Sequence, residues 1–85
     1  MSGKHLYAIA RAIKSHMAEF ATDENYGEQS DPVSLKHLNW MMCEIATRRV
    51  DGEKAHRWIG YAQGVLIAQS HMTLDEARVI VRSQL

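Results

Sequence analysis

The chain has 85 residues, enough for one domain with a thin core, because a domain of this size buries only about 60–65% of the surface its unfolded chain exposes. Ten basic and ten acidic side chains give a formal net charge of zero, which disfavours general nucleic-acid binding and favours self-association. Cys43 is the only cysteine, so no intramolecular disulfide can form, and we expect a cytoplasmic protein. We also expect neither a secretory signal peptide nor a membrane span, since no sufficiently long apolar run is present.

Apolar side chains at helical spacing predict a first helix over residues 4–21. Its buried stripe consists of Leu6, Ile9, Ala10, Ile13, Met17 and Phe20. Residues 22–31 follow without periodicity and carry four acidic side chains. We therefore expect an acidic loop there, long enough to be mobile.

A second helix is predicted over residues 32–49, with Asp31 as its N-cap and Pro32 at its first position. Its buried stripe consists of Leu35, Leu38, Met42, Ile45 and Ala46. Trp40 and His37 lie on the opposite face. Tryptophan away from a core face is enriched at interfaces, although Trp40 could instead cover the edge of another helix of the same bundle.

Two further helices are predicted over residues 53–69 and 74–83. The core face of the third consists of Ala55, Trp58, Ala62, Val65 and Leu66, with Ile59 at its edge. The fourth begins at a capping box formed by Thr73 and Glu76. Its inner face consists of Leu74, Ala77, Ile80 and Val81. No strand pattern competes, so we expect one all-α domain, a small bundle of three to four helices that forms a homo-oligomer.

Gly60 and Gly64 lie one turn apart inside the third helix, where each costs about 1 kcal/mol relative to alanine. A strip without side chains lets another backbone or a flat ligand approach closely. We interpret the strip as a self-association surface, most simply a two-fold homodimer contact, made by Gly60, Gly64, Ile67 and Ala68. The alternatives are close packing by a neighbouring helix of the same chain and a small-molecule groove.

The segments HLNWM (residues 37–41) and KAHRWIGYAQGVL (residues 54–66) resemble a group of small, largely uncharacterised proteins encoded by bacteriophages and prophages. The resemblance covers roughly residues 35–78, about half of the chain, and excludes the first helix and the acidic loop. It implies a context, since small phage accessory proteins often bind and disable a host component. The chain would then act in the host cytoplasm. The resemblance implies no activity and no site residue.

A surface for a partner or ligand is predicted from five residues: His37, Trp40, Lys54, Arg57 and Tyr61. Lys54 and Arg57 open the third helix, where the helix dipole does not favour basic side chains. Together with the helix amides they could hold an anion such as a nucleotide phosphate, although ordinary solvated charge also explains them.

We expect no enzymatic activity, no cofactor and no metal site. The five histidines include no pair spaced four residues apart, and zinc sites need tighter ligand spacing. Cys43 lies beside the buried stripe, which favours an apolar filler over a nucleophile. The leading hypothesis is a non-enzymatic binding protein that engages and inhibits a host protein. The alternatives are an oligomer that sequesters a nucleotide-like signal and a DNA-binding helical domain.

Overall fold

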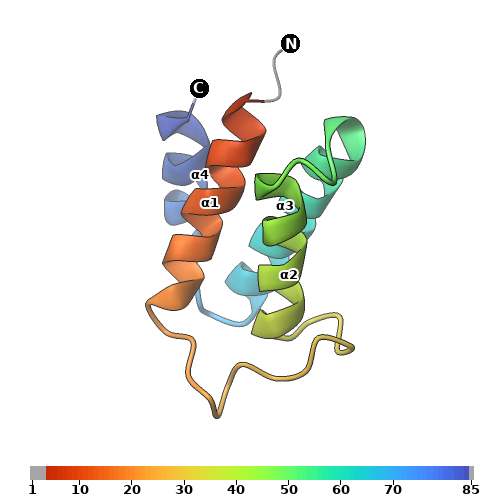
Figure 1. Cartoon of the computed structure of the whole chain (residues 1–85). Coiled ribbons are helices and arrows are strands. Elements are labelled where there is room, and N and C mark those ends of the chain that lie inside the picture. The colour runs from red at the N-terminus through yellow and green to blue at the C-terminus, as the bar shows by residue number, and fades with distance from the viewer. Residues whose placement is uncertain (1–3, 85) are drawn as a thin grey trace.

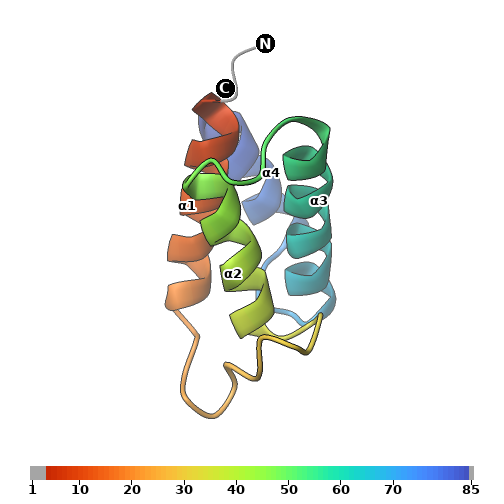
Figure 2. The same cartoon turned by 45° about the vertical axis from the view of Figure 1, so that its right-hand side comes forward.

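The computed structural model describes residues 4–84, and it confirms the all-α class for that part of the chain. Its helices are α1 (Lys4–Ala18), α2 (Leu35–Ala46), α3 (Gly52–Ala68) and α4 (Leu74–Ser83). Each helix runs antiparallel to the one before it, so α1 begins and α4 ends at the same end of the bundle (Figures 1 and 2). The radius of gyration of the Cα atoms is 11.9 Å, which matches the value of about 12 Å for a folded domain of this length.

The hydrophobic core lies between α1, α2 and α3. Helix α1 contacts each of the other three helices, and it packs most extensively against α2. The largest fully buried side chains are Ile13, Leu38, Met42, Ile45 and Leu66. Burial of each such side chain stabilises the fold by about 1.5–3 kcal/mol relative to leaving it exposed. The apolar stripes predicted for α1 and α2 therefore supply most of this core.

Helix α4 packs at the edge of the bundle. The capping box is present: the Thr73 hydroxyl accepts from the Glu76 amide, and the Glu76 carboxylate accepts from the Thr73 amide. Ala77 is buried, but Leu74 is 54% exposed, so its predicted place on the inner face is wrong. Ala77 is the one buried residue of α4, whereas Ile80 and Val81 are half-buried and pack against the core.

Three predicted helix boundaries are wrong. Helix α1 ends at Ala18 and not at residue 21, so Phe20 lies beyond the helix, half-buried, with its ring stacked on His71 at 5.0 Å. Helix α2 begins at Leu35 because Ser34 is its N-cap, accepting from the His37 amide at 3.0 Å. The helix ends three residues before the predicted position, at Ala46.

The acidic loop before α2 is anchored by hydrogen bonds. The backbone amide of Thr22 donates to the Asn25 side chain, which in turn donates to the Phe20 carbonyl at 2.8 Å. Gly27 has a φ of +78°, and a Cβ there would lie 2.7 Å from the Cβ of Ser34. Only glycine fits this turn, because an L-residue is strained at positive φ and no space remains for a side chain.

Candidate functional site

A groove with a volume of about 430 Å³ opens between α2 and α3. It is lined by Pro32, His37, Trp40, Met41, Arg57, Trp58 and Tyr61. We call this set of residues the aromatic groove. Four of the five residues predicted for partner contact line it, and the fifth, Lys54, lies beside it with Nζ 5.2 Å from the centroid of the Trp58 ring. The structure therefore brings the predicted surface together.

Three aromatic rings form a continuous row along the groove. The Trp40 and Trp58 rings lie 5.5 Å apart at an interplanar angle of 43°, and the His37 ring lies 5.5 Å from Trp40. These tilted geometries are in the range in which aromatic pairs attract one another. His37 and Trp40 are three residues apart on α2, so one helical face presents both to α3.

Trp58 was missed as a site residue, because helical spacing assigned it to the core face. Its side chain is half-buried, at the margin of a core face formed in α3 by Ala55, Ile59, Ala62 and Leu66. Trp40 is also half-buried and packs against the core as well as against Trp58. Trp40 thus covers the edge of another helix, as one alternative predicted, and still lines the open groove.

Hydrogen bonds fix the wall of the groove formed by the loop. The Tyr61 hydroxyl donates to the Pro32 carbonyl, and the Gln69 side chain donates to the next carbonyl along, that of Val33, at 2.8 Å. The His37 Nδ1 lies 2.8 Å from the Gln29 carbonyl and must donate to it, because a carbonyl only accepts. Side chains held in this way need little reordering when a ligand binds.

The charged side chains at the groove are basic. Among the described residues, Arg57 is the one charged residue that lines the groove, and the ammonium of Lys54 lies over the Trp58 indole. Glu53 lines a separate shallow depression with His56 and Arg57. The groove therefore combines a wide aromatic surface with positive charge at its margin.

The glycine strip of α3 is open to solvent. Gly60, Gly64 and Ala68 are exposed, and a Cβ built at either glycine would meet no atom within 4 Å. The alternative that another helix of the same chain packs against the glycines is therefore wrong. Ile67 is half-buried and packs against the protein's own core, which leaves only part of it for any external contact. Self-association through the strip stays a prediction.

Comparisons with known proteins identify no relative: no protein-family model matches the chain, and neither curated proteins nor solved structures give a significant match. Within residues 4–84, no group of three or more histidine, cysteine, aspartate or glutamate side chains is placed to hold a metal ion. None of the helices described here has the length and apolarity required to cross a bilayer.

Proposed function

We propose that the chain is a non-enzymatic protein-binding module whose aromatic groove receives an amphipathic, acidic helix of a partner polypeptide. One observation carries this proposal: Trp40 and Trp58 lie side by side in an open groove together with Arg57 and Tyr61. Tryptophan, tyrosine and arginine are the residue types that dominate the binding energy of protein interfaces.

The shape and charge of the groove favour this kind of occupant. It runs between two helices, and hydrophobic grooves on proteins commonly bind the apolar face of a partner helix. Its volume of about 430 Å³ suits one or two bulky apolar side chains. Arg57 and Lys54 at the margin complement carboxylates that flank the apolar anchor.

The resemblance to small bacteriophage proteins supports a host polypeptide as this partner. Occupation of the groove would then be the means by which the chain inhibits a host component. Because the groove is preorganised by its hydrogen bonds, we expect the partner helix to undergo the larger ordering on binding.

The test is native mass spectrometry of the tagged protein recovered gently from a bacterial lysate. We compare the wild type with Arg57→Glu, which reverses the charge at the groove, and with Arg11→Glu, which makes the same change at an exposed position of α1. We expect a bound polypeptide with the wild type and with Arg11→Glu, and at least about tenfold less with Arg57→Glu. A polypeptide retained equally by all three proteins would contradict the proposal.

A nucleotide-like ligand is the second candidate, favoured by the position of Lys54 over the Trp58 ring. An indole face can stack on a base while Lys54 and Arg57 pair with phosphate. In the same spectra, a retained mass of a few hundred daltons with no polypeptide would replace the first candidate by this one, if the recovered protein also absorbs ultraviolet light at about 260 nm, as nucleotide bases do. Steep loss of binding with salt would instead indicate DNA.

A further inference from the structure

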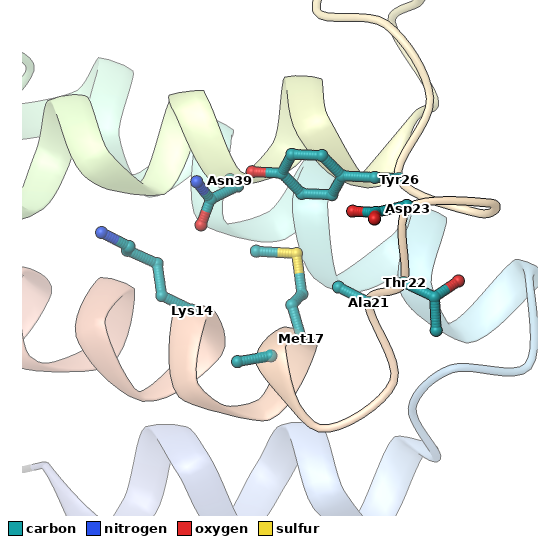
Figure 3. A pocket seen from close by; sticks show the side chains of 8 residues that line it. Lys14, Met17, Ala21, Thr22, Asp23, Tyr26 and Asn39 are labelled. Atoms are coloured by element: carbon teal, nitrogen blue, oxygen red, sulfur yellow. The ribbon is translucent and has the colours of Figure 1, made fainter.

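A second pocket, with a volume of about 350 Å³, lies between the end of α1, the acidic loop and α2 (Figure 3). It is lined by Lys14, Met17, Ala18, Ala21, Thr22, Asp23, Tyr26 and Asn39. It shares no lining residue with the aromatic groove, so any function of this pocket is independent of the function proposed above.

Three polar side chains gather at one end of the pocket. Lys14, Tyr26 and Asn39 come from α1, the loop and α2, and the Tyr26 hydroxyl is directed toward Asn39 (Figure 3). All three residues are half-buried, yet no hydrogen bond or ion pair seen within residues 4–84 involves these side chains. Every fully buried side-chain polar atom in that range has a hydrogen-bond partner. The unpaired polar atoms of these three side chains are therefore not buried, and they remain accessible to a ligand.

The remainder of the pocket has a different character. Met17, 2% exposed, lies next to the Tyr26 ring, and Ala18 and Ala21 extend this apolar surface (Figure 3). The carboxylate of Asp23 lies at the end away from Lys14. The pocket thus has a donor-rich cationic end, an apolar middle and an anionic end.

We propose that this pocket binds a small monocarboxylate with a short apolar body and a neutral or cationic far end. The Lys14 ammonium pairs with the carboxylate, and the Asn39 amide and Tyr26 hydroxyl donate to its oxygens. The apolar body lies against Met17 and the Tyr26 ring. Asp23 disfavours a second anionic group at the far end, since like charges repel.

The test is an NMR titration of backbone amides and methionine methyl groups with three probes: hexanoate, adipate and hexylamine. We expect hexanoate to produce saturable shifts at Met17, Tyr26 and Asn39. Adipate binds more weakly than hexanoate because of Asp23. Hexylamine, which has no carboxylate for Lys14, Asn39 and Tyr26 and can pair only with Asp23, also produces smaller shifts than hexanoate. Lys14→Met, which retains a good helix former, weakens hexanoate binding by about tenfold. Lys54→Met, the matched change at the aromatic groove, leaves it unchanged.

Several results would overturn the proposal. Absence of saturable shifts with hexanoate would do so. Shifts with hexylamine as large as those with hexanoate would also do so. The third such result is unchanged hexanoate binding in a Lys14→Met variant whose circular dichroism matches the wild type. The role of Asp23 is tested by Asp23→Asn, which we expect to bring adipate binding close to that of hexanoate. Adipate binding that is already equal to hexanoate in the wild type would contradict that role.

Discussion

The indole rings of Trp40 and Trp58 lie 5.5 Å apart across the boundary between α2 and α3. They are the only two tryptophans in the chain, so intrinsic tryptophan fluorescence reports on the aromatic groove alone. The same contact helps to join two helices of the bundle and forms the wall of the candidate site. Stability and binding can therefore be measured with one optical signal.

The tryptophan pair should show a direct energetic coupling. We expect Trp40→Ala and Trp58→Ala each to lower the free energy of unfolding by about 2 kcal/mol, less than for a fully buried ring. The loss of stability in the double variant should be smaller than the sum of the losses in the two single variants. The difference, about 0.5–1.5 kcal/mol, is the energy of the aromatic contact. Urea unfolding followed by circular dichroism measures this cycle, and strictly additive losses would contradict the contact.

Alanine substitutions at three glycines should have opposite effects. If the strip is open to solvent, Gly60→Ala and Gly64→Ala should each raise the free energy of unfolding by about 0.5–1 kcal/mol, because within one chain a Cβ at either position meets no atom within 4 Å. Gly27→Ala should lower it by about 2 kcal/mol, because the backbone there has positive φ and the new Cβ clashes with Ser34. Thermal and urea unfolding measure all three. A loss of stability at Gly60 or Gly64 would show that something contacts the strip in solution.

Self-association through the glycine strip is tested by a bulky substitution. Gly64→Leu introduces a side chain on an open face of α3, so the fold of a single chain should tolerate it. If the strip forms the expected dimer contact, the mass in solution measured by light scattering should halve while helix content is retained. The matched control is Arg82→Leu on the exposed surface of α4. A mass that is the same in wild type and Gly64→Leu would contradict the self-association prediction.

The capping box of α4 should make stability depend on pH. The Thr73 backbone amide, 2.8 Å from the Glu76 carboxylate, holds the pKa of Glu76 below its ordinary value of 4.5. Because the folded pKa is lower than the unfolded one, this carboxylate stabilises the fold fully above about pH 4.5, and the contribution is lost as the pH falls through the folded pKa. Unfolding measured across this range should show the wild type losing its advantage over Glu76→Gln at the acid end. Parallel curves for the two proteins would be the contrary result.

Local sequence patterns determined the helices and the stripes that form the core. A helix satisfies its own backbone hydrogen bonds, and burial of apolar side chains every three or four residues requires only that some neighbour be present. For this reason the stripes of α1 and α2 and the capping box at Thr73 could be predicted. The N-cap was misplaced because Asp31 and Ser34 are both good capping residues. The Ser34 hydroxyl accepts from the His37 amide inside α2, whereas the Asp31 carboxylate accepts from the Val33 amide, before the helix begins.

Most residues of the candidate site were also predictable, because an aromatic or basic side chain outside a core stripe needs another explanation. What only the tertiary structure decided is which faces meet. The period of a helix tells which residues share a face, but the position of each neighbouring helix determines how much of that face is covered. That position left Leu74 and the glycine strip exposed, placed Trp58 beside Trp40, and opened the pocket between Lys14, Tyr26 and Asn39.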